Sequence, residues 1–199
     1  MKKHLVILAK APRLGIAKRR LAADIGMVPA ARFQRRALEE TVRRLAPDTR
    51  WDTWLATTGG PMRWPAGVRR MRQPAGDLGQ RMDRAIRDFT PGPVVIVGSD
   101  IPDIMPTHIA DAFKVLGRHD AVFGPADDGG YWLVGLRRRP AHPDLFRPVR
   151  WSTRHALADT VDNLGERFDH AMLETLIDID NAAALRRWSA GRRDCAQPR

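Results

Sequence analysis

The chain has 199 residues, of which 43% are hydrophobic, and a formal net charge of +11 at pH 7. This length suits one domain with a sizeable core, and no apolar run reaches the roughly 20 residues that a membrane span needs. The single cysteine excludes an internal disulfide, and the apolar run near the N-terminus is too short for a signal peptide. We therefore expect a cytoplasmic protein without a membrane span.

The positive charge is compatible with nucleic-acid binding, because clustered Lys and Arg side chains displace counterions from phosphates. The arginines, however, are spread over the predicted helices and loops, without a nucleic-acid-binding motif or interleaved aromatic residues. We therefore expect a solvated basic surface that binds no specific nucleic acid. Such a surface still attracts small anionic substrates.

The first third of the chain is predicted to alternate strands and a helix. Leu5–Ala9 is an apolar run typical of a buried strand, and a helix begins at Pro29 and ends near Ala46. Further strands are predicted at Trp51–Thr58 and Val68–Gln73. Between the first strand and the helix, residues 10–21 form a basic loop with a glycine, which is a candidate phosphate-binding loop. It lacks the Gly-Lys-Ser/Thr ending of a Walker loop, and a solvated basic loop is an equal alternative.

The middle of the chain continues the same alternation. Asp77 is predicted to cap a helix that ends at Phe89, and Pro106–Leu116 is the next helix. Between them, Val94–Val97 has the β-branched pattern of a strand buried on both faces. Asp120–Phe123 and Tyr131–Leu136 are a strand pair that suggests one antiparallel or irregular pairing.

Near the C-terminus, Ser152 is predicted to cap a helix that ends at Leu164, and Leu176–Asn181 to end a last short strand before a terminal helix. Strand and helix thus alternate throughout, which predicts an α/β fold with three layers (α/β/α) and a mostly parallel central sheet. We expect one domain over residues 1–190 and a frayed tail over residues 191–199.

Carboxylates follow two of the buried strands. Asp100 follows Val94–Gly98 after one intervening residue, at the strand end where ligands bind in open α/β sheets, so it is a candidate ligand of a divalent cation. A helix or turn cap is the alternative for Asp100. Asp127-Asp128-Gly129-Gly130 separates the strand pair, where two carboxylates indicate a functional loop and a simple hairpin turn is the alternative.

Short motifs stand in order along the chain: Leu8–Leu21, Gly76–Met82, Gly98–Asp103, Gly124–Leu136, Leu145–Phe146, Trp151–Ser152 and Asp178–Asp180. Together they resemble the glycosyltransferase-A-like proteins called radical-SAM/selenodomain-associated transferases, and the resemblance runs from Leu5 to about Arg187. It implies the fold of the nucleotide-diphospho-sugar transferases. The first loop also resembles that of phospholactate guanylyltransferase.

The chain departs from the pattern of this family at a few positions. Arg19 and Met105 stand where the family usually has Thr, Asp127 where it has Glu, and Asn181-Ala182 where it has Thr-Pro. None of these changes removes a carboxylate or the pair Lys10 and Lys18. They bear on the specificity for the acceptor.

The resemblance implies a phosphate-binding first loop and an aspartate that holds Mg²⁺. The predicted metal ligands for Mg²⁺ or Mn²⁺ are Asp100, Asp178 and Asp180. The predicted catalytic residues are Lys10, Lys18, Asp100 and Asp128. The predicted nucleotide-binding residues are Ala9, Lys10, Gly15, Lys18, Arg20, Gly76, Asp77, Leu78, Gly98 and Ser99. The predicted acceptor-binding residues are Asp127, Asp128, Gly129, Gly130 and Tyr131.

The predicted function is a metal-dependent transferase that uses a nucleoside triphosphate or a nucleotide-sugar and a small-molecule acceptor. The first loop carries more cations than a diphosphate leaving group requires, which favours nucleotidyl transfer. The alternatives are glycosyl transfer from a nucleotide-sugar and a nucleotide-binding module without turnover. The cations concerned are Lys10, Arg13, Lys18, Arg19 and Arg20.

Overall fold

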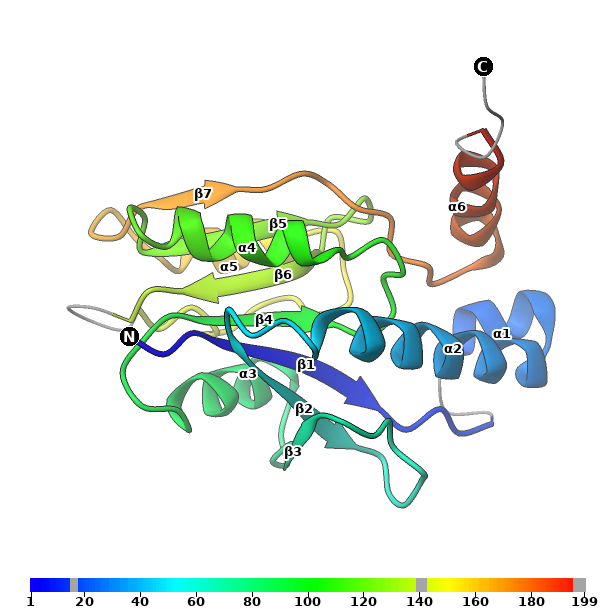
Figure 1. Cartoon of the computed structure of the whole chain (residues 1–199). Coiled ribbons are helices and arrows are strands. Elements are labelled where there is room, and N and C mark those ends of the chain that lie inside the picture. The colour runs from blue at the N-terminus through cyan, green and yellow to red at the C-terminus, as the bar shows by residue number, and fades with distance from the viewer. Residues whose placement is uncertain (15–17, 139–142, 195–199) are drawn as a thin grey trace.

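The computed structural model describes residues 1–14, 18–138 and 143–194, the last four of these by their backbone alone (Figure 1). Gly15, predicted to bind nucleotide, and the last five residues of the predicted tail lie outside these ranges. No helix in the described ranges combines the length and the apolar character that crossing a membrane requires.

A seven-stranded sheet with the order β3-β2-β1-β4-β6-β5-β7 forms the centre of the molecule (Figure 1). Strand β6 runs antiparallel to β4 and β5, and the other neighbouring strands are parallel. The predicted α/β fold with a mostly parallel sheet is therefore confirmed, including the antiparallel pair. The strands are β1 (His4–Lys10), β2 (Asp52–Thr58), β3 (Arg69–Arg72), β4 (Val94–Gly98), β5 (Ala121–Pro125), β6 (Tyr131–Leu136) and β7 (His170–Met172).

Helices cover both faces of the sheet, as expected when a sheet is apolar on both sides. Helices α2 and α4 pack on one face through Leu38 and Phe113, and α3 and α5 pack on the other through Ile86 and Val161. Helices α1 and α6 contact each other beyond the carboxyl ends of the parallel strands (Figure 1). The helices are α1 (Arg19–Ile25), α2 (Met27–Leu45), α3 (Leu78–Arg87), α4 (Pro106–Val115), α5 (Ala156–Asp162) and α6 (Ala182–Asp194).

The strand register brings several chain segments to one edge of the sheet. Leu8 pairs with Gly98, so β4 ends two residues before β1 does, and the loops after both strands emerge at the same edge of the sheet. Strands β5 and β7 are parallel in the same sheet, and Ala126 and Leu176 form one more bridge beyond their ends. Residues from four separate parts of the sequence therefore meet at the edge where open α/β sheets bind ligands.

Two expectations for the last third of the chain were wrong. Helix α5 begins after His155, and Ser152 does not cap it, because Ser152 has a φ of 61° instead of the extended backbone of a cap. The last strand is β7, and the segment after Leu176 is not a strand. Its apolar alternation resembles a strand, but the Asp180 amide donates to the Asp178 carbonyl at 3.1 Å and turns the chain.

Two further differences are smaller. Helix α1 begins at Arg19, inside the loop expected over residues 10–21, and runs beyond it to Ile25. Helix α6 continues to Asp194, beyond the expected domain end at residue 190. At the start of α4, Met105 stands where the similar family has Thr and makes no side-chain capping hydrogen bond, but the His108 ring binds the backbone amide of the capping position. The Nδ1 atom of His108 accepts a hydrogen bond from the Met105 amide at 3.1 Å.

Candidate active site

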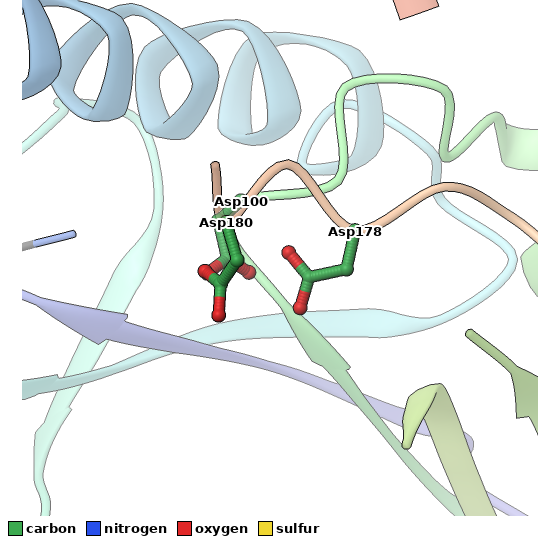
Figure 2. A group of neighbouring side chains, drawn as sticks. All are labelled: Asp100, Asp178 and Asp180. Atoms are coloured by element: carbon green, nitrogen blue, oxygen red, sulfur yellow. The ribbon is translucent and has the colours of Figure 1, made fainter. Parts of the chain in front are cut away.

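Three aspartates converge at the carboxyl edge of the sheet (Figure 2). Asp100 comes from the loop after β4, and Asp178 and Asp180 come from the segment after β7. One carboxylate oxygen of each lies within 4.8 Å of one oxygen of both others. The three residues predicted as metal ligands, which we call the carboxylate trio, are thus brought together from positions about eighty residues apart.

The segment that carries Asp178 and Asp180 is held by Asp127. The Asp127 Oδ1 atom accepts a hydrogen bond from the Asp178 amide at 3.1 Å, and its Oδ2 atom accepts from the Arg187 guanidinium. The Asp127 amide in turn donates to the Leu176 carbonyl. Both carboxylate oxygens of Asp127 are therefore used to hold the trio segment and α6.

The loop that carries Asp100 is anchored from two other helices. A guanidinium nitrogen of Arg44, on α2, donates to the carbonyls of Pro102 and Ile104 at 2.6 and 2.9 Å. The indole of Trp188, on α6, donates to the Asp103 carboxylate at 2.9 Å. These contacts explain Asp103, the last residue of the 98–103 motif, as an anchor for the loop.

The ammonium of Lys18 lies among the three carboxylates. Its Nζ atom is 2.7 Å from an Asp100 oxygen, 3.2 Å from an Asp178 oxygen and 2.5 Å from an Asp180 oxygen. The Lys18 side chain is 4% exposed, and its backbone is left-handed, with φ 47° and ψ 51°. Lys18 directly precedes α1, so the backbone turns sharply where the side chain enters the trio.

Burial is the largest influence on the protonation of this cluster. It disfavours the charged Lys18, but the three carboxylates outweigh it and raise the pKa of Lys18 above its ordinary value. Burial also disfavours the charged Asp100, but the Lys18 ammonium holds the pKa of Asp100 below its ordinary value. For Asp178, burial and the Asp100 charge raise the pKa to about 7. One ammonium therefore does not balance the negative charge of the trio.

Two cavities open beside the trio. The larger, of about 950 Å³, lies over the edge of the sheet, and the smaller, of about 330 Å³, extends between the sheet and α3. The smaller cavity is bounded by Met82 of α3 and by Ile96 and Val134 of the sheet. Six residues line both cavities: Lys10, Gln34, Leu78, Asp100, Tyr131 and Asp178.

The residues predicted to bind nucleotide fall into two groups. Lys10, Lys18, Arg20 and Leu78 line the larger cavity, and Gly98 and Ser99 line the smaller one. Ala9, Gly76 and Asp77 are not among the described residues that line either cavity.

The first of these three, Ala9, is 1% exposed inside the sheet. Asp77 caps α3 by accepting from the Gln80 amide at 2.8 Å, while the Gln80 side chain accepts from the Asp77 amide. Gly76 has a φ of 120°, and a Cβ there would lie 2.1 Å from the Gln80 Oε1 atom. The start of α3 therefore accounts for both residues.

The residues predicted to bind the acceptor also divide. Asp128, Gly130 and Tyr131 line the larger cavity, and the Gly130 amide donates to the Asp128 carboxylate at 2.9 Å. Gly129 has a φ of 86°, and a Cβ there would lie 2.3 Å from the Arg154 carbonyl oxygen. The Gly129 carbonyl accepts from the Leu157 amide, so this glycine packs the loop against the start of α5.

Gln34, on α2, is a cavity residue that the sequence reasoning missed. It is 6% exposed, and its Nε2 atom donates to the Lys10 carbonyl at 3.4 Å. Its Oε1 atom is buried without a hydrogen-bond partner in the described part of the chain. A polar residue within the buried stripe of a helix was the available signal. The larger cavity is also lined by Trp151, Ser152 and Thr153. The first two belong to a motif to which the sequence reasoning gave no role in binding, and it did not single out Thr153.

Comparison with known proteins gives a family. A family model described as "Uncharacterized protein conserved in bacteria (DUF2064)" matches residues 31–153, more than half of the chain. The chain belongs to this family. The matched residues of this chain contain β2 to β6 and so include Asp100 and Asp128, but neither Lys18 nor Asp178. Among curated proteins there is no match.

Solved structures agree with the architecture of this DUF2064 protein. A protein of the nucleotide-diphospho-sugar transferase type from Desulfovibrio desulfuricans G20 is 28% identical, with a TM-score of 0.90 over 98% of this chain and 90% of that chain. The 4-diphosphocytidyl-2C-methyl-D-erythritol synthase of Anaerococcus prevotii is 10% identical, with a TM-score of 0.61 over 96% of this chain and 98% of that chain.

A third similar structure is the glucosyl-3-phosphoglycerate synthase of Mycobacterium tuberculosis, in complex with Mn²⁺, uridine diphosphate and glucosyl-3-phosphoglycerate. It is 13% identical, with a TM-score of 0.56 over 89% of this chain and 70% of that chain. Nucleotidyltransferases and glycosyltransferases are therefore both among the structural neighbours. The fold is that of the nucleotide-diphospho-sugar transferases.

Proposed function

We propose that the protein is a divalent-metal-dependent transferase that uses a nucleoside triphosphate and transfers its nucleotidyl group to a small acceptor. The observation that carries this proposal is the carboxylate trio beside a cavity lined by cations, at the carboxyl edge of the sheet. The neighbours with this fold, which include enzymes of both nucleotidyl and glycosyl transfer, support a nucleotide-using transferase.

The trio fits Mg²⁺ or Mn²⁺ by the chemistry of its donors. Three carboxylates offer the hard oxygen ligands that these ions take, and the structure already places one cation, the Lys18 ammonium, among them. Asp100, Asp178 and Asp180 would hold the ion. When bound, it would supply charge neutralisation and orientation for the phosphates.

Three further cations, Lys10, Arg19 and Arg20, line the larger cavity and would bind the phosphates directly. Their charges would stabilise the negative charge that develops on the phosphate oxygens during transfer. Arg13 does not join them, since its guanidinium lies over Gly60. The smaller cavity, which Met82, Ile96 and Val134 bound with apolar side chains, would take the nucleoside.

Asp128 is the residue that we assign to the acceptor. It lines the larger cavity and is oriented by the Gly130 amide, so it would accept the proton of an acceptor hydroxyl as that oxygen attacks phosphorus. Asp127 is a positioning residue instead, because its two oxygens hold the Asp178 amide and Arg187.

Glycosyl transfer from a nucleotide-sugar is the second candidate, favoured by Asp128 beside a cavity large enough for a sugar. The two reactions release different products. Incubation with each nucleoside triphosphate, Mg²⁺ and a pool of phosphorylated and hydroxylated metabolites should release pyrophosphate. A nucleoside diphosphate released from a nucleotide-sugar, with no pyrophosphate from any triphosphate, would assign glycosyl transfer. Nucleotide binding with neither product would indicate a module without turnover.

A further inference from the structure

The position of the Lys18 ammonium excludes a metal ion from the same place. Nζ contacts one oxygen of each of the three carboxylates, at 2.7, 3.2 and 2.5 Å. A divalent ion bound by the same oxygens would need distances of about 2.0–2.6 Å from them, and so would occupy the same centre. The ammonium and the ion therefore compete for one position, and a bound ion requires that Lys18 move.

The charges indicate where Lys18 moves. The trio carries up to three negative charges, and a divalent ion in its centre offsets more of them than one ammonium does. The Lys18 side chain is 4% exposed where it lies in the trio, so an ammonium that gives up the three carboxylates and stays buried needs another anionic partner. The phosphates of a nucleotide in the adjoining cavity offer a replacement partner, since Lys18 lines that cavity.

The backbone at Lys18 agrees with a residue held by its side chain. Its φ of 47° lies in the left-handed region, which costs free energy for a residue with a Cβ. Lys18 has no side-chain hydrogen bond that caps α1. The three ion pairs of Nζ therefore stabilise this backbone conformation, and their exchange for phosphate contacts would relax it.

We propose that Lys18 is a built-in competitor of the metal, which closes the carboxylate trio in the nucleotide-free protein and passes to the phosphates when the nucleotide arrives with its ion. This inference rests on the proposed function and adds a regulation to it. Free metal ions bind weakly because they must displace the ammonium. Metal and nucleotide bind cooperatively. The ion releases the Lys18 ammonium from the trio for the phosphates, and the phosphates stabilise the ammonium that the ion displaces.

The test compares Mn²⁺ binding to the wild-type protein, Lys18→Met and Lys10→Met, by calorimetry and by the free-Mn²⁺ signal in electron paramagnetic resonance. Lys10 lines the same cavity but has no ion pair with the trio among the described residues, so it controls for the loss of one positive charge. We expect Lys18→Met to bind Mn²⁺ at least about tenfold more tightly than wild type, and Lys10→Met by clearly less.

A non-hydrolysable nucleoside triphosphate provides the second half of the test. It should raise the Mn²⁺ affinity of the wild type by about tenfold or more and that of Lys18→Met by much less. Two results would overturn the competition while leaving the metal site in place. One is equal Mn²⁺ affinities of wild type and Lys18→Met without nucleotide, and the other is an increase in Mn²⁺ affinity in Lys10→Met as large as that in Lys18→Met. Absence of Mn²⁺ binding to all three proteins, with and without nucleotide, would overturn the proposed metal-dependent function as well.

Lys18→Met leaves the trio without a cation and could fail to fold without metal. Lys18→Gln is the second variant, because its amide still donates to a carboxylate but carries no charge. It should also bind Mn²⁺ more tightly than wild type, and Mn²⁺ should raise its melting temperature more than that of the wild type. A Lys18→Gln variant whose melting temperature responds to Mn²⁺ as the wild type does would overturn the proposal.

Discussion

Asp127 holds Asp178: the Asp127 carboxylate accepts the Asp178 backbone amide at 3.1 Å, although the side chains of the two residues serve different purposes. The loop after β5 thereby sets the position of the segment that carries two of the three trio carboxylates. Asp127→Ala should lower the Mn²⁺ affinity several-fold without a change in the affinity for the acceptor, because the hydrogen bond that positions the Asp178 backbone is lost. Calorimetry with Mn²⁺ measures the first and steady-state kinetics the second.

The conservative variant Asp127→Asn separates the two contacts of this residue. Its Oδ1 atom still accepts from the Asp178 amide, whereas the charge that pairs with Arg187 is lost. It should therefore keep most of the Mn²⁺ affinity. A larger effect of both variants on the acceptor KM than on metal binding would return Asp127 to the acceptor site.

Asp100→Asn should abolish metal-dependent nucleotide binding and preserve the fold. The substitution replaces a carboxylate ligand with a neutral amide and leaves Lys18 two carboxylates to pair with. Titration of a fluorescent nucleotide with and without Mg²⁺ measures the effect, and circular dichroism checks the fold. Asp128→Asn, in the same cavity but outside the trio, is the control and should retain the Mg²⁺ dependence. Undiminished Mg²⁺ dependence in Asp100→Asn would remove Asp100 from the metal site.

Much of this architecture could be predicted from the sequence. Val94–Gly98 is a buried strand because four apolar β-branched residues precede a glycine, and the position of Asp100 then follows from the carboxyl end of a parallel strand. The hydrophobic periodicity of α2 likewise predicts its buried stripe. These local patterns predict the structure well because the apolar residues that form them are the ones that the core buries.

Other features depend on contacts distant in sequence and could not be predicted. The three partners of Lys18 lie beyond any local pattern, so the sequence suggested a phosphate contact, whereas the structure pairs Lys18 with carboxylates. Gly76 and Gly129 look like ligand-binding glycines, but their neighbours Gln80 and Arg154 explain them sterically. Ser152 is a residue type that favours helix caps, but its backbone is left-handed and α5 begins only after His155.

Gly129→Ala should destabilise the protein by about 1–3 kcal/mol, because the new Cβ meets a carbonyl oxygen at 2.3 Å and φ is 86°. Gly165 is a matched control, since its φ is 64° but a Cβ there meets nothing within 4 Å. Gly165→Ala should therefore cost only the backbone strain, about 1 kcal/mol. Urea unfolding of both variants measures the difference. Equal losses in the two variants would show that the contact with Arg154 does not constrain the loop.

His4 should make the stability of the protein depend on pH. The ring is 4% exposed and stacks on Phe89 at 4.4 Å, and neither ring nitrogen has a hydrogen-bond partner in the described part of the chain. Burial lowers the pKa of His4 below its ordinary value, so the unfolded chain takes up the proton first. The contribution of His4 is thus fully present above the ordinary histidine pKa and is lost as the pH falls below it.

Replacement by Leu, which does not titrate, tests this dependence. As the pH falls from 8 to 5.5, the free energy of unfolding of wild type should decrease more than that of His4→Leu, because only the wild type binds a proton at this site on unfolding. Urea unfolding at the two pH values gives the comparison. Parallel losses in both proteins would mean that the His4 pKa is the same in the folded and unfolded chains.

The central claim, that the carboxylate trio binds a divalent ion together with a nucleotide, is tested most directly by a crystal structure with Mn²⁺ and a non-hydrolysable nucleoside triphosphate. The anomalous signal of manganese locates the ion independently of any model. We expect that signal between Asp100, Asp178 and Asp180, with the Lys18 ammonium withdrawn from the trio and in contact with the phosphates. Manganese bound elsewhere, or a nucleotide bound while the ammonium still fills the trio, would contradict the claim.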